Sequence, residues 1–177
     1  MNPTANARRI HRMIRVDQAG EFGATRIYAG QLAVMGDRSA LSPEIRHMAE
    51  QEAEHREQFD ALLARRGVRP TALQPLWSAA GYALGAATAL LGPEAAMACT
   101  AAVEEEIDRH YSEQLDELES TGADPELAGL IERFRADEPE NRDAALAAGA
   151  ERAPAYPLLA GAIRLGCRLA IRVSERI

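Results

Sequence analysis

The chain has 177 residues, which fits one domain with a sizeable hydrophobic core. It is 47% hydrophobic but only 5% aromatic, and it has no runs of alternating β-branched residues, so we expect an all-α protein. The formal net charge of -7 argues against a nucleic-acid partner, because phosphate binding needs a basic surface. The two cysteines lie in apolar stretches and are typical of buried thiols in a reducing compartment.

The N-terminal part predicts two long helices. The first should run from about residue 6 to residue 35 and be closed by Gly36. The second should begin at Ser42-Pro43, with serine as the N-cap and proline in the first turn, and end near Gly67. The first fifteen residues hold four arginines but no apolar core of a secretory signal, so we expect a cytoplasmic chain.

Between residues 70 and 103 the only charged side chain is Glu94. Gly92-Pro93 divides this segment. The first piece, about residues 76–91, is short for a membrane span, which needs about 20 residues, and suits a helix lying in a membrane interface. Tight packing around a bundle is the alternative. The second piece should continue to residue 119 as a third bundle helix.

The C-terminal part predicts a fourth bundle helix over about 125–148 and a last helix over about 155–175. Arg164, Arg168 and Arg172 place one basic stripe beside the apolar face of the last helix. We therefore expect a single domain over 1–177, a four-helix bundle with additional hydrophobic helices for membrane association.

Each bundle helix carries a glutamate where its apolar stripe should hold a hydrophobic residue. These are Glu21, Glu52 (followed three residues later by His55), Glu104 and Glu138. A lone Glu followed by a Glu-x-x-His helix, with the pair then repeated, is how a four-helix bundle builds a di-metal carboxylate site. Four ionised carboxylates in one core need compensation, so we predict two metal ions, with iron or manganese favoured over zinc.

The glutamates outside these stripes should be solvated surface residues. They are Glu50, Glu54, Glu105, Glu106 and Glu140. His110 lies one position off the third stripe, so it is either a partner of a metal-bound carboxylate or a surface histidine. His11 and His47 lie outside the stripes and should be exposed.

Several long motifs resemble those of the demethoxyubiquinone hydroxylase family. They are RVDQAGEFGA and RIYAGQ within 15–31, QEAEH at 51–55, GPEAAMACT leading to VEE within 92–105, and SERI at 174–177. The resemblance covers nearly the whole chain. It implies a ferritin-like bundle with two irons that hydroxylates the demethoxyubiquinol ring with O2 in ubiquinone biosynthesis. It also implies a peripheral membrane protein, here on the cytoplasmic face of the cell membrane.

The resemblance also assigns roles to individual residues. The implied iron ligands are Glu21, Glu52 and His55 in one half and Glu104 and Glu138 in the other, with Glu52 and Glu138 as bridges and with His110 and Tyr111 as candidate catalytic residues beside the metals. The implied substrate is a prenylated quinone at a membrane surface, with a homo-oligomer or ubiquinone-biosynthesis proteins as further partners. Because no Rossmann-type glycine fingerprint is present, electrons should come from outside, from NADH or through the quinol.

The second half-site departs from the family, because it reads Glu138-Pro139-Glu140-Asn141, with asparagine in place of histidine. Proline opposes a helix interior by about 3 kcal/mol and disfavours α geometry at Glu138. Either Asn141 or water completes a working site, or the second iron binds loosely, or only the fold and the quinone surface remain. We expect a working enzyme. The alternatives are a quinone- or lipid-binding or assembly protein and a ferritin- or rubrerythrin-like iron oxidase.

Overall fold

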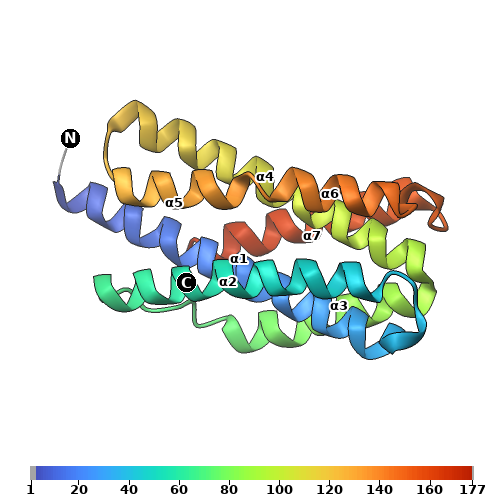
Figure 1. Ribbon diagram of the computed structural model, residues 1–177. Helices are drawn as coiled ribbons and strands as arrows, with labels where there is room; N and C mark the ends of the chain where they lie inside the picture. The colour runs from blue at the N-terminus through green and yellow to red at the C-terminus, as the bar shows by residue number, and fades with distance from the viewer. Residues whose placement is uncertain (1–2, 177) are drawn as a thin grey trace.

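The computed structural model describes residues 3–176, which form helices and contain no strand (Figure 1). The helices are α1 (Pro3–Met35), α2 (Ser42–Arg66), α3 (Gln74–Leu91), α4 (Pro93–Thr121), α5 (Pro125–Arg135), α6 (Glu138–Ala147) and α7 (Tyr156–Ser174), with 3₁₀ turns at Gly36–Arg38 and Ala150–Arg152. The predicted all-α class is confirmed. Ile177, the last residue of the SERI motif, lies outside the described residues.

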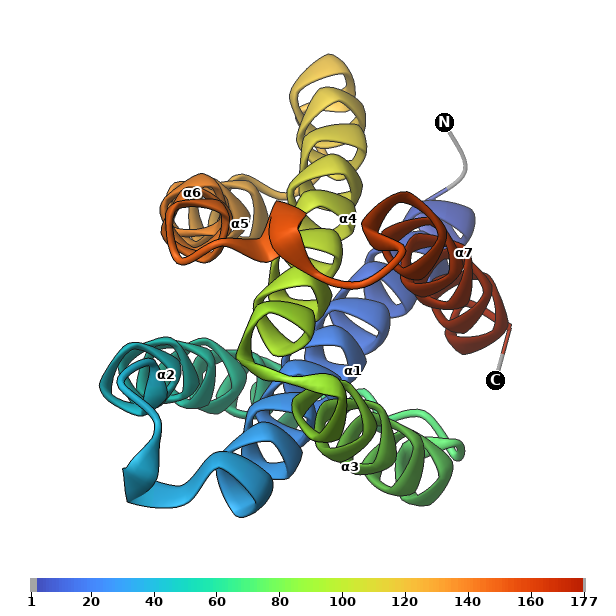
Figure 2. The same cartoon turned by 90° about the vertical axis from the view of Figure 1, so that its right-hand side faces the viewer.

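Helices α1, α2 and α4 and the consecutive pair α5–α6 form a four-helix bundle, seen end-on in Figure 2. Outside it, α3 packs mainly on α1 and α7 mainly on α4. This arrangement confirms the expected ferritin-like bundle with two further apolar helices.

Two apolar clusters fill the bundle. One includes Phe59, Leu127 and Ile131, and the other includes Met48 and Met97. Along each bundle helix, the buried glutamates fall between the residues of these two clusters. These glutamates form an acidic layer across the bundle. Apolar side chains close this layer at both ends, which keeps its local dielectric constant low.

Helix α3 approaches α1 through glycine. A Cβ atom on Gly85 would lie 1.9 Å from the carbonyl oxygen of Ile27, and one on Gly30 would lie 2.2 Å from that of Tyr82. Only glycine permits so close a backbone contact. The glycine-rich segment is thus tightly packed on one side. Tight packing against the bundle was the alternative to a helix lying in a membrane interface.

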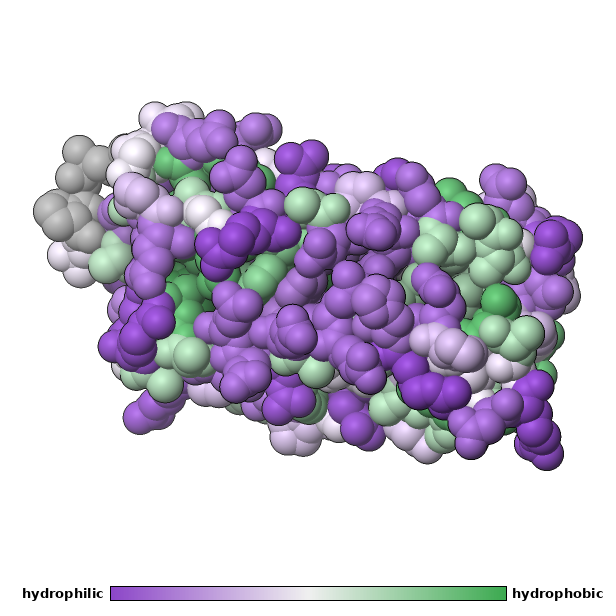
Figure 3. All heavy atoms as spheres, viewed as in Figure 1, coloured by the Kyte–Doolittle hydropathy of each residue, from purple (hydrophilic) through white to green (hydrophobic). Residues whose placement is uncertain are grey.

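The other sides of α3 and α7 are exposed and apolar. Their exposed large hydrophobic side chains are Leu76, Tyr82, Leu90 and Leu91 on α3 and Leu158, Leu165, Leu169 and Val173 on α7. By contrast, the face over α2, α5 and α6 is mostly hydrophilic (Figure 3). Among the described residues, no helix is both long and apolar enough to cross a membrane.

The prediction of one helix over 125–148 was wrong, because the chain breaks at 136–137 into α5 and α6. The break moves Pro139 from a helix interior to the first turn of α6, where an amide hydrogen has no helical partner to lose. Glu138 remains in α geometry as the first residue of α6, contrary to the prediction for a residue before proline.

The prediction that Glu106 is solvated was also wrong, since its side chain is 1% exposed. It accepts hydrogen bonds from Arg168 of α7 at 2.6 Å and from Arg109 at 2.6 Å. Burial raises the pKa of Glu106, but these two guanidinium groups outweigh it and lower the pKa overall. Arg164 likewise pairs with Glu105 at 2.6 Å, so the basic stripe joins α7 to α4.

Candidate metal centre

Four glutamates from four different helices meet in the acidic layer of the bundle. Glu21 of α1, Glu52 of α2, Glu104 of α4 and Glu138 of α6 all have no exposed surface. Ligand atoms of Glu52, Glu104 and Glu138 lie within 4.8 Å of one another, and so do those of Glu21, His55 and Glu138. Glu138 is common to both groups, and two neighbouring cation positions are therefore outlined.

Two buried tyrosines each donate a hydrogen bond to one carboxylate oxygen of this cluster. The hydroxyl of Tyr28 donates to Oε1 of Glu104, and that of Tyr111 donates to Oε1 of Glu21. Among residues 3–176, the remaining oxygens of the four glutamates and Nδ1 of His55 have no hydrogen-bond partner. Buried polar atoms are rarely left unpaired. This set of carboxylate oxygens and one imidazole nitrogen fits two iron or manganese ions.

The electrostatics of the cluster also favour bound cations. Burial raises the pKa of Glu52 well above its usual range, and the nearby charge of Glu21 raises it further. Burial does the same at Glu138, with Glu104 adding to it. Without cations the cluster must hold protons, whereas bound metal ions would favour the ionised carboxylates.

His55 is held with one nitrogen facing the cluster. Its Nε2 lies 3.0 Å from Oδ2 of Asp137, and its ring stacks on Phe134 with centroids 4.1 Å apart. Nδ1 is left 3.7 Å from Oε2 of Glu21. Burial lowers the pKa of His55, but Glu21 and Asp137 outweigh it and raise the pKa overall. A carboxylate on the far nitrogen orients an imidazole for metal binding.

No local pattern marks Asp137, because the residue follows no apolar periodicity and is brought to His55 by the break between α5 and α6. Tyr28 lies on the same face of α1 as Glu21, two turns after it, and this spacing is the signal that indicates a hydroxyl directed at the acidic layer.

Asn141 lies one turn after Glu138 on α6 and is 3% exposed. Its Nδ2 atom has no hydrogen-bond partner among the described residues. Because an amide can present either its nitrogen or its oxygen at one place, Asn141 can offer a neutral oxygen where imidazole is expected.

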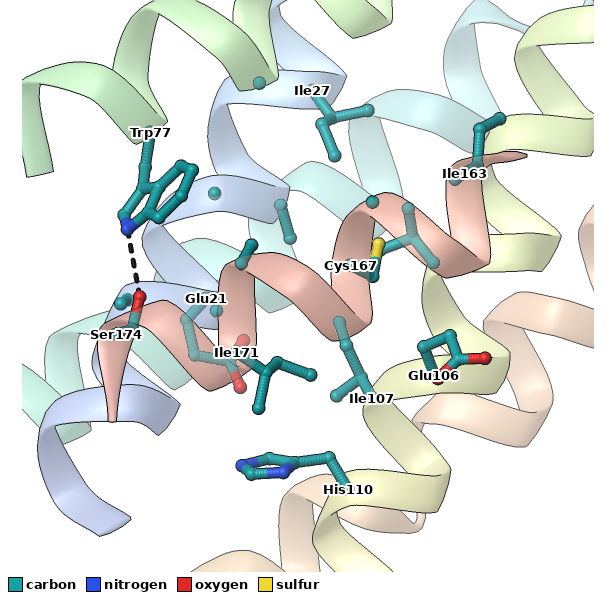
Figure 4. Close-up of a pocket in the computed structure, with 18 of the residues that line it drawn as sticks. Glu21, Ile27, Trp77, Glu106, Ile107, His110, Ile163, Cys167, Ile171 and Ser174 are labelled. Atoms are coloured by element: carbon teal, nitrogen blue, oxygen red, sulfur yellow. Dashed lines mark hydrogen bonds between the residues drawn. The ribbon is translucent and has the colours of Figure 1, made fainter. Parts of the chain in front are cut away.

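An apolar pocket of about 510 Å³ lies between α1, α3, α4 and α7 (Figure 4). Ile27, Trp77 and Ile163 contribute to its walls, and Glu21, His110 and Tyr111 are among its few polar lining residues. Glu21 therefore belongs both to the acidic cluster and to the pocket. His110 and Tyr111, singled out from the sequence, are together at this junction.

A sequence profile of the family described as "Ubiquinone biosynthesis protein COQ7" matches residues 8–174. The chain belongs to this family. The resemblance inferred from the motifs is thereby confirmed over nearly all of the chain.

Curated relatives of this COQ7-family chain are similar along most of their length. Over 170 residues it is 57% identical to the 3-demethoxyubiquinol 3-hydroxylase of Rhodospirillum rubrum, covering 95% of the chain and 78% of the relative. It is 52% identical, with the same coverage, to the human mitochondrial NADPH-dependent 3-demethoxyubiquinone 3-hydroxylase. It is 43% identical over 187 residues to the mitochondrial 5-demethoxyubiquinone hydroxylase of Saccharomyces cerevisiae, covering 98% and 80%. The relatives are thus hydroxylases of one substrate class.

Proposed function

We propose that this chain hydroxylates the ring of demethoxyubiquinol with O2, using two irons held in the acidic layer. The observation that carries the proposal is the position of Glu21, which lines the apolar pocket and belongs to the buried carboxylate cluster. A ring that enters the pocket is thereby brought to the edge of the cluster. The names of the hydroxylase relatives support the same reaction.

The proposed iron ligands are the six residues predicted from the sequence, Glu21, Glu52, His55, Glu104, Glu138 and Asn141. Glu138 belongs to both ligand groups, which supports a bridging role for it, whereas Glu52, the other bridge that the resemblance implies, belongs to one group only. The irons, when bound, supply the activation of oxygen. Electrons would come from a nicotinamide nucleotide, which the name of the human relative supports.

The protein would perform the remaining tasks. The apolar walls bind the quinol and its prenyl tail and exclude water, which strengthens electrostatic interactions at the ring. Tyr28 and Tyr111 each hold one oxygen of Glu104 and of Glu21, so that the other oxygen of each carboxylate would be free to hold a metal ion.

The exposed leucines of α3 and α7 support peripheral attachment to a membrane, proposed here as the cytoplasmic face of the cell membrane. Replacing Leu90 and Leu158 together by glutamate should weaken binding to phospholipid vesicles at least tenfold and leave the melting temperature unchanged. Ala61→Glu, an exposed change on α2, is the matched control and should bind as the wild type does. Equal binding by all three proteins would refute this attachment surface.

The reaction is tested with protein purified anaerobically. Elemental analysis should find about two irons per chain, and turnover with a short-tailed demethoxyubiquinol, O2 and NADH should add one oxygen to the ring. Iron oxidation by O2 without any effect of the quinol would instead indicate an iron oxidase. Tight quinol binding without iron would indicate a quinone-binding protein, the alternative that Asn141 favours.

A further inference from the structure

Asp17 is a buried carboxylate that the proposed metal centre does not use. It lies on α1 one turn before Glu21, and its side chain has no exposed surface. Its Oδ1 atom is 3.1 Å from Nε2 of His110 and 2.7 Å from Nε2 of Gln114, both on α4. The Gln114 nitrogen is itself 2.8 Å from Nε2 of His110. Three polar groups thus meet at one buried point between α1 and α4.

Burying the Asp17 carboxylate costs free energy that packing alone does not recover. Burial raises the pKa of Asp17, while the hydrogen bonds from His110 and Gln114 act against it. No arginine pairs with Asp17 among the described residues. The contrast on the same helix is Gln18, which donates at 2.8 Å to Asp60, an acid whose side chain is 42% exposed, and so links α1 to α2 without a histidine. A link between helices therefore does not require a fully buried acid.

Nε2 of His110 can either donate to Asp17 or accept from Gln114, and the negative charge of the carboxylate favours the protonated nitrogen. When Nε2–H donates to Asp17, the neutral ring keeps Nδ1 unprotonated as a hydrogen-bond acceptor. Among residues 3–176, Nδ1 of His110 has no hydrogen-bond partner, and the ring lines the apolar pocket beside Glu21 (Figure 4). The nitrogen left over is thus available to a ligand in the pocket.

We propose that Asp17, whose Oδ1 also accepts from Gln114, is a positioning residue that holds Nε2–H of His110, so that Nδ1 accepts a hydrogen bond from a ring hydroxyl of the quinol. This inference rests on the proposed function, because the quinol is its ligand. A carboxylate that holds a histidine in one tautomer is a general device for directing the other nitrogen to a substrate. In this chain, the hydrogen bond to Nδ1 of His110 would determine which edge of the quinol ring faces Glu21.

The first test reads the tautomer directly. The full chain is labelled with ¹⁵N-histidine, loaded with diamagnetic Zn²⁺ and studied by long-range ¹H–¹⁵N NMR, with His110→Gln to assign the His110 signals. Neutral His110 should be protonated at Nε2 in the wild type, and Asp17→Leu should mix or invert the tautomers. Asp60→Leu, which removes the other Gln–Asp link of α1, should leave the signals unchanged. A wild type protonated at Nδ1, or an unchanged tautomer in a folded Asp17→Leu, would overturn the proposal.

The second test adds the ligand. A short-tailed demethoxyubiquinol should quench the fluorescence of Trp77, the only tryptophan, and shift the Nδ1 resonance of His110. Quenching without that shift would overturn the role of His110 and leave the pocket and the hydroxylase proposal standing. Absence of quenching would overturn both. In iron-loaded protein, Asp17→Leu should lower kcat about 100-fold at unchanged iron content, and Asp60→Leu should change it less than about twofold.

Discussion

The two halves of the acidic cluster are built on helices of different construction. Glu52 and His55 lie in the middle of α2, an unbroken helix of 25 residues. Glu138 and Asn141 lie in the first turn of α6, a helix of 10 residues that begins after a break. Both arrangements bring a carboxylate to the same place. A helix start can therefore replace a helix interior as the support of a ligand.

The helix start also adds what a helix interior does not. The N-terminal end of α6 carries partial positive charge near Glu138, which opposes, without cancelling, the rise that burial causes in the pKa of this carboxyl group. The break turns Asp137 toward His55, so one half of the cluster helps to orient the other. Pro139 and Asn141, which depart from the Glu-x-x-His pattern, thus occur in a local structure that tolerates both residues.

Loss of Glu138, the residue shared by both ligand groups, should damage the site most. Glu138→Ala should abolish metal binding in both halves and reduce turnover at least about 1,000-fold, because one side chain serves two ions. Elemental analysis of anaerobically purified protein measures the loss. Glu140→Ala, an exposed neighbour on the same helix, should retain about two irons. A Glu138→Ala protein with a full complement of iron would contradict the shared role.

The second prediction compares proline at matched positions of the two half-sites. Ala53→Pro puts proline directly after Glu52 inside α2 and should lower the free energy of unfolding by about 3 kcal/mol or more. Pro139→Ala, directly after Glu138, should change it by less than about 1 kcal/mol, because Pro139 already lies in a first turn. Urea unfolding gives both values. Equal losses in the free energy of unfolding would mean that the break before α6 does not remove the cost of a proline at position 139.

The third prediction concerns the metal-free protein. The pKa of Glu52 is raised in the fold, so its contribution to stability is present below the usual value of 4.5 and is lost as pH rises through the raised value. Glu52→Gln escapes this loss. It should be more stable than the wild type by about 2 kcal/mol near pH 7.5, roughly 4–8 °C in melting temperature, and equal to it near pH 4.

Glu54→Gln, an exposed change on the same helix, is the control and should show no such dependence on pH. A gain for Glu52→Gln that is the same at both pH values would show that ionisation is not its cause.

Changes at Asn141 should have a milder result than those above. Asn141→His should strengthen binding of the second metal ion about tenfold, because imidazole is a better ligand than a neutral amide. Asn141→Ala should weaken it if the amide oxygen is a ligand. Anaerobic titration with Fe²⁺ compares the three proteins. An alanine variant with wild-type affinity would assign that position to water.

Local periodicity explains what could be predicted. The apolar stripes and their interruption by Glu21, Glu52, Glu104 and Glu138 follow from 3.6 residues per turn, so the all-α bundle and the meeting of these side chains were accessible from the sequence. The long motifs identified the family for the same reason, since they are continuous stretches of chain.

Contacts between helices explain the rest. The burial of Glu106 depends on Arg168, which is 62 residues away, and the place of His55 depends on Asp137, which is 82 residues away. Arg168 is marked only as part of a basic stripe and Asp137 by no local pattern, so neither partner can be assigned from the sequence. The helices, the acidic positions and the family can be predicted locally, because each is encoded within a few turns of chain. The helix break, the pocket and the Asp17–His110 contact require the folded molecule, because each results from which helix faces bury one another.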